Sequence, residues 1–124
     1  MTLVDTSVWV AHFRRRDADL ERMLSEEEAL IHPFVIGELA CGNLRQRPKT
    51  LEWFRLIPSV RVAEPDEVLA LIEGKRLYGL GLGWIDVNLL ASALVDNCTF
   101  WTLDNALRQA AAKAVLRIYP ATVH

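Results

Sequence analysis

The feature that most constrains the fold of this chain is the alternation of short β-prone runs with segments of helical spacing. The β-prone runs predict strands at residues 2–4, 29–32, 60–63, 99–103 and 116–119. Helical spacing predicts helices at residues 8–13, 17–27, 33–44, 50–56, 65–78, 85–95 and 105–113. This alternation favours an α/β fold, namely an α/β/α sandwich whose central, mostly parallel sheet is covered on both faces.

The size and composition of the chain predict one domain. Single domains cluster at roughly 100–150 residues, and we find no repeat or long linker, so we expect one domain over residues 1–124. Hydrophobic residues make up 52% of the chain, which provides a sizeable core and excludes a disordered tail. The net charge of −2 excludes a protein that holds nucleic acid by bulk charge, so a nucleic-acid partner would require a local basic patch.

The cysteines and the apolar runs bear on the compartment. Cys41 and Cys98 are far apart and form no C-x-x-C pair, which favours a reduced cytoplasm. The N-terminus has no basic stretch leading into an apolar one, so we expect no secretory signal. The charge-free run at residues 77–85 contains three glycines and falls well short of the roughly 20 apolar residues that cross a bilayer. We therefore expect no membrane span.

Two aspartates follow predicted strands at the carboxyl ends, where open parallel sheets form their ligand crevices. Asp5 follows the first strand and Asp104 follows the fourth. Each also precedes a predicted helix, so each fits equally well as an N-cap residue that accepts hydrogen bonds from the first turn. Together they predict two carboxylates on one rim of the sheet.

Two further acids stand on apolar stretches of predicted helices. The residues three and four positions from Glu38, and likewise from Asp86, include no polar partner. An ionised carboxylate buried without a partner costs several kcal/mol or more, so Glu38 must reach water, become protonated or meet a cation. Each acid also has an alternative that needs no cation. Glu38 would lie at the edge of its apolar stretch and reach water, and Asp86 would serve as a helix N-cap.

The four acids Asp5, Glu38, Asp86 and Asp104 make joint sense if folding brings them together around a divalent cation. Positive charge relieves the repulsion between carboxylates, and ligation by oxygen alone favours Mg²⁺ or Mn²⁺. Zinc is disfavoured because the histidines are scattered, at His12, His32 and His124. A Mg²⁺ site that retains water suits phosphodiester chemistry, and the sequence leaves open whether one or two ions bind.

Four short motifs surround these acids. They are Val4-Asp5-Thr6-Ser7-Val8-Trp9, Ile36-Gly37-Glu38-Leu39, Trp84-Ile85-Asp86-Val87-Asn88-Leu89-Leu90-Ala91 and Trp101-Thr102-Leu103-Asp104. In their order, and over essentially the whole chain, they resemble the PIN-domain ribonucleases, specifically the VapC-type toxins of bacterial toxin–antitoxin pairs.

This resemblance implies a PIN-like fold and an Mg²⁺- or Mn²⁺-dependent endoribonuclease that leaves a 5′-phosphate and a 3′-hydroxyl. It maps the catalytic and metal-binding acids onto Asp5, Glu38 and Asp86, with Asp104 as the fourth, and makes Thr6 or Ser7 a supporting hydroxyl. It also implies a VapB-type antitoxin whose C-terminal segment covers the cleft, and a toxin homodimer.

Asn88 departs from the family pattern, because many relatives begin this helix with Asp-Ala. Asn88 either touches the site or begins a polar stripe, Asn88, Ser92 and Asp96, whose spacing is more typical of a solvated helix face.

Two basic clusters are the candidates for RNA binding. They are Arg14, Arg15 and Arg16, and then Arg45, Arg47 and Lys49. The first cluster fits equally well as the solvated end of a helix whose C-terminus favours cations. Phosphate contact is the preferred interpretation for the second.

Two other functions share these residues. One is a different Mg²⁺-dependent phosphohydrolase, including a receiver-like domain, but the chain offers no lysine at a strand end to hold a phosphoryl group. The other is a non-catalytic PIN-like module that binds RNA or protein. That module would be expected to lack at least one acid, and none is missing.

Overall fold

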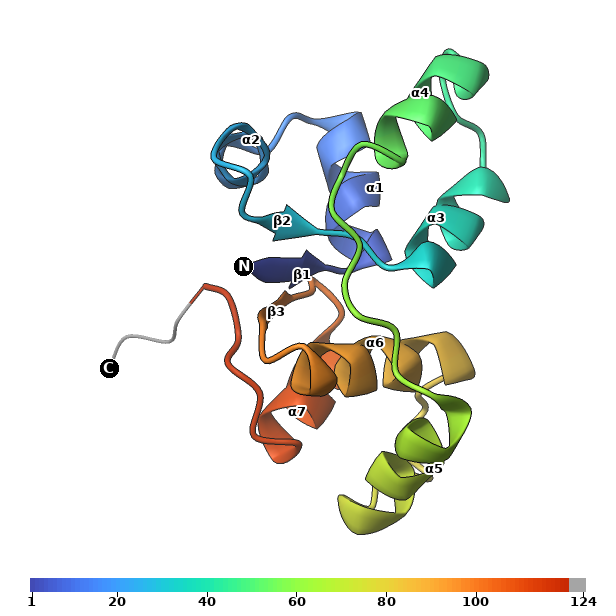
Figure 1. Ribbon diagram of the computed structural model, residues 1–124, viewed down its shortest axis with the longest axis vertical. Helices are drawn as coiled ribbons and strands as arrows, with labels where there is room; N and C mark the ends of the chain where they lie inside the picture. The colour runs from blue at the N-terminus through green and yellow to red at the C-terminus, as the bar shows by residue number, and fades with distance from the viewer. Residues whose placement is uncertain (121–124) are drawn as a thin grey trace.

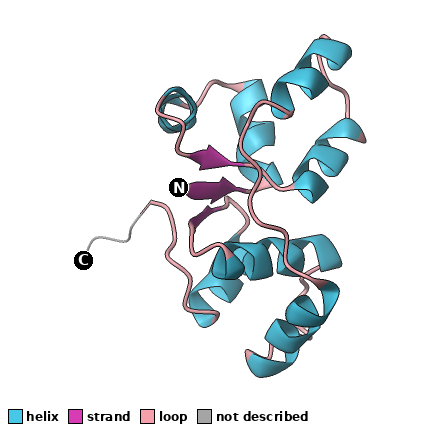
Figure 2. Ribbon diagram, viewed as in Figure 1, coloured by secondary structure: helices cyan, strands magenta, loops and turns pink. Residues whose placement is uncertain are grey.

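The computed structural model describes residues 1–120, so the last four residues of the predicted 1–124 domain, including His124, lie outside the described part. The elements are β1 (Thr2–Val4), α1 (Thr6–Arg14), α2 (Ala18–Ser25), β2 (Ala29–Leu30), α3 (Pro33–Ala40), α4 (Arg47–Phe54), α5 (Pro65–Gly74), α6 (Trp84–Val95), β3 (Thr99–Trp101) and α7 (Asn105–Lys113). Figure 2 shows how small the sheet is beside the helices that surround it.

The sheet is parallel throughout, which confirms the predicted α/β class. Its strand order is β2-β1-β3, with Leu3 opposite Leu30 on one side and Phe100 on the other. Parallel strands covered on both faces are buried and read as apolar runs, as β1 does here. Figure 1 shows the three strands between α1 to α4 on one side and α5 to α7 on the other. The carboxyl ends of all three strands therefore meet at one edge.

The core extends from both sides of this sheet. Trp9, Phe54 and Phe100 are its largest fully buried side chains. Trp9 makes edge-to-face contacts with Trp53 and Phe54, with ring centroids 5.9 and 5.8 Å apart, so α4 is anchored to α1 through aromatic rings. This packing fixes α1, whose first turn lies at the carboxyl edge of the sheet.

Two predicted strands are wrong. The parallel bridge of Ile31 with Ser59 lies just before residues 60–63, and residues 116–119 contribute to a single parallel bridge, Phe100 with Ile118. After the first bridge, side chains of α6 replace the strand ladder, because Asp96 accepts from the Arg61 N–H and Ser92 accepts from the Ala63 N–H. A segment whose N–H groups bond to side chains cannot continue the sheet.

Several helix boundaries also differ from the predictions. The predicted helix 33–44 ends at Ala40, where the Arg47 guanidinium donates to the carbonyls of Ala40 and Gly42. The predicted helix 65–78 ends at Gly74, and Arg76 follows with a positive φ of 52°. Both helices end where groups beyond the helix bond to its last carbonyls: the Arg47 guanidinium bonds to Ala40 in α3, and the Leu77 N–H bonds to Ile72 in α5.

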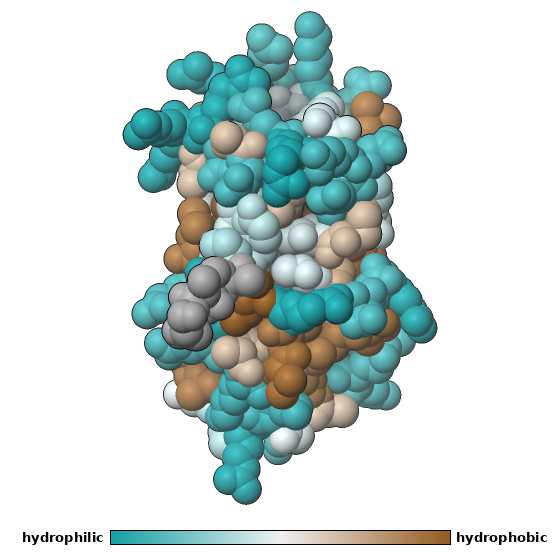
Figure 3. Space-filling view, turned by 90° about the vertical axis from the view of Figure 1, so that its left-hand side faces the viewer, coloured by the Kyte–Doolittle hydropathy of each residue, from teal (hydrophilic) through white to brown (hydrophobic). Residues whose placement is uncertain are grey.

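The surface at the amino ends of the strands differs between its two halves. Figure 3, which views this side, shows hydrophilic side chains over the upper part and apolar side chains gathered in the lower part. Among the residues that the structure describes, no helix combines the length and the apolar composition needed to cross a bilayer.

Candidate active site

The carboxyl edge of the sheet carries the acids that the sequence singled out. Asp5 follows β1 directly and Asp104 follows β3 by three residues. Asp5 caps α1 by accepting from the Ser7 N–H, and Asp104 caps α7 by accepting from the Leu107 N–H at 3.1 Å. The N-cap interpretation and the shared-rim interpretation are therefore both correct, because capping a helix is what holds each aspartate at the strand end.

Asp5 is the buried member of the set, with 5% of its surface exposed. Its Oδ2 atom accepts from Ser7 Oγ and from Thr102 Oγ1, both at 2.7 Å. In residues 1–120 no comparable bond reaches Oδ1 of the same carboxylate. Two short hydroxyl hydrogen bonds therefore fix the rotamer and leave the other oxygen available to a ligand.

Thr102 is a site residue that the sequence analysis missed. It is fully buried, donates to Asp5 and accepts from the Asp104 N–H at 3.0 Å, so one hydroxyl joins the two strand-end acids. The available signal was its position two residues before Asp104, in the motif Trp101-Thr102-Leu103-Asp104. Ser7 contributes from the carboxyl end of the neighbouring strand β1, and its Oγ also accepts from the Leu103 N–H at 3.0 Å.

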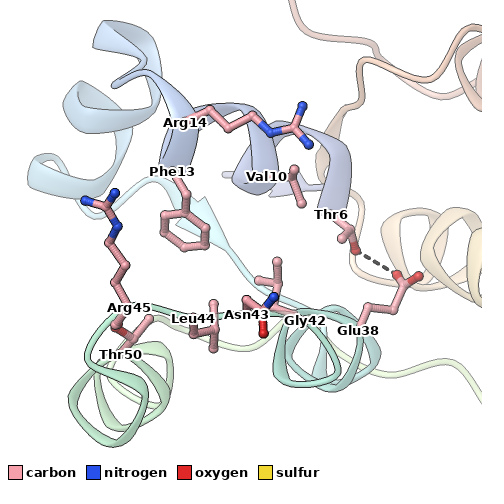
Figure 4. Close-up of a pocket in the computed structure, with 11 residues that line it drawn as sticks. Thr6, Val10, Phe13, Arg14, Glu38, Gly42, Asn43, Leu44, Arg45 and Thr50 are labelled. Carbon is pink, nitrogen blue, oxygen red and sulfur yellow. Dashed lines mark hydrogen bonds between the residues drawn. The ribbon is translucent and has the colours of Figure 1, made fainter.

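Glu38 lies on α3 beside the start of α1. The hydroxyl of Thr6 donates to Glu38 Oε1 at 2.7 Å, a bond drawn in Figure 4. Glu38 is exposed, so of the three alternatives for its carboxylate the structure supports the one in which the head group reaches water. Thr6 thus acts as the hydroxyl that directs Glu38, while Ser7 directs Asp5.

Asp86 stands in the first turn of α6, half-buried, three residues after Gly83. Its Oδ2 atom accepts from the Gly83 N–H at 3.0 Å, so Asp86 closes the helix start from inside it and is not the N-cap residue itself. Burial raises the pKa of Asp86, the neighbouring charges of Asp5 and Asp104 raise it further, and the Gly83 hydrogen bond opposes both. Asp5 and Asp104 therefore lie close enough to Asp86 for their charges to act on it.

Asn88 does not belong to a solvated stripe. Asn88 and Ser92 are both buried, with 3% and 0% of their surface exposed, which contradicts the preferred interpretation of their spacing. The Asn88 amide donates to the Trp84 carbonyl at 2.9 Å, one turn back in the same helix. Asn88 therefore steadies the start of α6, which carries Asp86, and within residues 1–120 its side chain bonds to the backbone alone.

The four carboxylates have no cation of their own in residues 1–120. None of the ion pairs there involves Asp5, Glu38, Asp86 or Asp104. Each carboxylate has one oxygen held by a hydrogen bond, Oδ2 of Asp5, Oε1 of Glu38, Oδ2 of Asp86 and Oδ1 of Asp104. Oxygen ligands of this kind suit Mg²⁺ or Mn²⁺, and the donor set therefore fits a hard divalent cation.

The arrangement is not a finished coordination sphere. In the described part of the chain, no three histidine, cysteine, aspartate or glutamate side chains are grouped so that they could hold an ion as they stand. Exposed Glu38 and half-buried Asp86 can rotate, whereas Asp5 is fixed. A cation bound at Asp5 would attract the mobile carboxylates towards it, since their mutual repulsion is otherwise uncompensated.

A cavity of about 720 Å³ opens beside Glu38, between α1 and the segment that runs from α3 to α4. Arg14 and Arg45, one from each predicted basic cluster, line it (Figure 4). The other basic candidates lie elsewhere: Arg16 pairs with Glu21 at 2.7 Å, Arg47 donates to carbonyls at the end of α3, and Arg15 and Lys49 are exposed outside the cavity lining.

Comparison with known proteins identifies the fold. The family model described as PIN domain matches residues 2–113. Two solved structures share the fold: one described as FitAB bound to an IR36 DNA fragment, and the crystal structure of PAE2754 from Pyrobaculum aerophilum. The first has a TM-score of 0.70, 16% identity and coverage of 96% of this chain and 94% of that one. The second has a TM-score of 0.61, 21% identity and coverage of 94% and 81%.

Sequence similarity identifies the branch of the family. The chain is 46% identical over 115 residues to Ribonuclease VapC32 of Mycobacterium tuberculosis, in strain CDC 1551 / Oshkosh and in strain ATCC 25618 / H37Rv alike. This match covers 92% of the chain and 93% of the relative. The acids at the carboxyl edge of a small parallel sheet, the PIN domain match and this identity lead to one conclusion: the chain belongs to the PIN domain family, in its VapC branch.

Proposed function

We propose that this VapC-type ribonuclease is an Mg²⁺- or Mn²⁺-dependent endoribonuclease, the toxin of a toxin–antitoxin pair, that hydrolyses an RNA phosphodiester with water as the nucleophile. The observation that carries the proposal is Asp5, a buried carboxylate that Ser7 and Thr102 fix through Oδ2 and that, together with Asp104, lies near enough to raise the pKa of Asp86. Repulsion within a cluster of acids that has no cation of its own destabilises the folded protein, and a bound cation relieves this repulsion.

The residues divide the work of such a site. Asp5, Glu38, Asp86 and Asp104 would hold the cation, and Thr6, Ser7 and Thr102 orient the carboxylates towards it. When bound, Mg²⁺ or Mn²⁺ lowers the pKa of water and balances the negative charge that develops on the phosphate. The pKa of Asp86 is raised, so Asp86 keeps its proton to a higher pH than an ordinary aspartate does. Because a ligand carboxylate must be deprotonated, loss of this proton favours the metal-bound state of the protein.

The toxin assignment carries partners with it. We infer a VapB-type antitoxin and a homodimer from the VapC family. Fourteen large apolar side chains are exposed in the described residues, and they provide surface for such contacts. Size-exclusion chromatography with light scattering of the purified toxin tests the homodimer, and a monomer at micromolar concentration would contradict it.

We also infer a reducing compartment, the cytoplasm, because both cysteines are free thiols.

Replacement of Asp5 by asparagine tests the proposed chemistry. Asp5→Asn keeps an oxygen that can accept from Ser7 and Thr102 but removes the charge that holds a cation, so RNA cleavage should fall by at least about 100-fold. Cleavage is measured on total RNA with Mg²⁺, with Mn²⁺ and with chelator, followed by sequencing of the new RNA ends. Circular dichroism checks that the variant is folded.

Asp66→Asn provides a matched control, because Asp66 is an exposed acid in the first turn of α5, which carries none of the four acids. This variant should cleave RNA as the wild type does. Undiminished cleavage by Asp5→Asn, or full activity of the wild type in chelator, would overturn the metal-dependent mechanism.

A further inference from the structure

We propose that the cavity beside Glu38 is a nucleobase-binding subsite, in which the ring of Phe13 stacks on one base of the RNA while Arg14 and Arg45 bind the adjoining phosphates. The inference rests on the proposed ribonuclease function and adds to it the residues that position the substrate. It starts from the cavity of about 720 Å³, which has Thr6 and Glu38 at one end and the two arginines among its other lining residues.

Phe13 is placed as a platform. Its side chain is 44% exposed and points into the space between α1 and the residues that follow α3 (Figure 4). Behind it lie the buried rings of Trp9 and Phe54, with centroids 6.3 and 6.0 Å from that of Phe13. A ring that is supported on one side and open on the other can receive a base without losing much side-chain freedom.

The charges around the cavity favour a phosphate-bearing ligand. In the part of the chain that the structure describes, neither Arg14 nor Arg45 takes part in an ion pair or a side-chain hydrogen bond, whereas Arg16, Arg22 and Arg47 all do. Glu38 is the one acid that lines the cavity among the described residues. Two guanidinium groups without side-chain partners, in a cavity that a single carboxylate lines, are suited to phosphate oxygens.

The size and lining of the cavity match a nucleotide. Val10, Leu39 and Leu44 provide apolar walls beside Phe13, and the volume lies in the range of about 300–1,000 Å³ that is typical of small-molecule sites. Because the cavity ends at Glu38, the stacked base would lie at a fixed number of nucleotides from the bond that is cut. Phe13 would then help to select the cleavage position.

A fluorescence experiment tests the subsite. Short oligoribonucleotides tiled across an RNA that the wild type cleaves each carry one 2-aminopurine, whose emission is quenched by stacking. They are titrated with Asp5→Asn, so that the RNA stays intact. We expect quenching at one position, at a constant distance from the cut, because only the base in the cavity meets the Phe13 ring.

Substitutions of Phe13 separate stacking from apolar contact. Phe13→Leu in the Asp5→Asn background should abolish the local quenching and weaken RNA binding by roughly 5- to 150-fold, the range for loss of one base–aromatic stack. Phe13→Tyr keeps the ring and should retain both. Leu69→Ala, at an exposed apolar position on α5, is the matched control and should leave binding unchanged.

Substitutions of the arginines provide an arm that does not depend on the packing of Phe13. Arg14→Gln and Arg45→Gln should each reduce the slope of log Kd against log salt by about 1, as loss of one phosphate contact does. Arg61→Gln is the matched control, because Arg61 is exposed in the segment before α5 and lies outside the cavity lining. Its salt slope should equal that of the parent.

The outcomes distinguish this inference from the function on which it rests. If the wild type cleaves RNA but Phe13→Leu and the two arginine variants bind it as the parent does, the subsite is wrong and the nuclease assignment stands. If those variants instead weaken binding of the antitoxin alone, the cavity holds a protein segment and the subsite is again wrong. If the wild type cleaves no RNA with either metal, both proposals fail.

Discussion

At the scale of single residues, the hydroxyl groups around Asp5 decide whether the carboxylates can act together. Thr102 donates to Asp5 Oδ2 and accepts from the Asp104 N–H, while Ser7 donates to the same Oδ2 atom. A carboxylate held in this way does not have to be reoriented when a cation binds, which is the usual effect of groups behind the ligands of a metal site. Thr102 is therefore a positioning residue.

The effect of Thr102 should be visible in the metal dependence. Thr102→Val keeps the shape but removes the hydroxyl, so kcat/KM for RNA should fall by about 10- to 100-fold, and more Mn²⁺ should be needed for half-maximal rate. Thr102→Ser should restore most of the rate. The control is Thr99→Val, at the start of β3. An unchanged Mn²⁺ requirement in Thr102→Val would contradict the positioning role.

The acids stand out in the sequence, and the resemblance adds Thr6 or Ser7 as a supporting hydroxyl, but the contacts of Thr102 and Ser92 could not be predicted. Asp5, Asp86 and Asp104 stand out because a charged group next to an apolar strand or helix turn needs a reason to be there. A hydroxyl is tolerated almost anywhere, so Thr102 gives only its place in the motif that ends at Asp104, and Ser92 gives no such signal. Their partners, Asp5 and Ala63, lie 97 and 29 positions away, so no local pattern contains them.

At the scale of the elements, side chains decide where the strands and helices end. Four helices are capped by side chains that accept backbone N–H bonds, namely those of Asp5, Asp17, His32 and Asp104. Three of these four residues are aspartates, whose capping role can be predicted from the sequence. His32 is the exception. The segment at residues 60–63 alternates like a strand, yet the N–H groups of Arg61 and Ala63 bond to the side chains of Asp96 and Ser92, and the alternation gives no sign of these partners.

His32 joins three elements and should make the stability of the protein depend on pH. It is fully buried and accepts from the Phe34 N–H through Nδ1, so the hydrogen resides on Nε2, which faces Ser92 Oγ at 3.1 Å. Burial lowers the pKa of His32 to about 4 from its ordinary value of 6.5. Protonation of Nδ1 would also destroy the cap of α3.

The sign of the pH effect follows from these values. Between pH 6.5 and about 4 the unfolded chain binds a proton at His32 that the folded protein does not bind. The free energy of unfolding should therefore decrease as the pH falls through this range, by up to about 3 kcal/mol.

Urea unfolding at several pH values measures this dependence. His32→Asn, which retains a capping side chain, should be less stable at neutral pH but should show a flatter dependence on pH. Equal slopes for the wild type and His32→Asn would show that other groups cause the acid sensitivity.

At the scale of the whole molecule, the site is a concentration of negative charge at one edge of the sheet. Asp86 feels the charges of Asp5 and Asp104 directly, and no ion pair within residues 1–120 offsets them. The fold therefore stores repulsion there, as functional sites often do at the expense of stability. A divalent cation should stabilise the folded protein by removing this repulsion.

Thermal unfolding tests the stored repulsion without any assay of activity. Mn²⁺ at about 100 times its Kd should stabilise the wild type by about 2.7 kcal/mol and raise its Tm by several degrees. Asp86→Asn removes one of the repelling charges, so this variant should unfold at a higher temperature than the wild type in chelator. It should also gain less from Mn²⁺.

Glu73→Gln, at an exposed acid near the end of α5, is the control and should respond to Mn²⁺ as the wild type does. A wild-type Tm that does not respond to Mn²⁺, with Asp86→Asn no more stable in chelator, would contradict the account of the site as a repulsive cluster relieved by metal.

The hydrogen bond between Thr102 and Asp5 spans 97 positions of the chain. A ribosome that has made α1, α3 and even α6 has still not delivered the hydroxyl that secures the first acid, nor Asp104 behind it. Partial chains and early truncation products should accordingly be harmless to the RNA around them. Under the proposed function, the chain becomes able to cut RNA only once its synthesis is nearly complete.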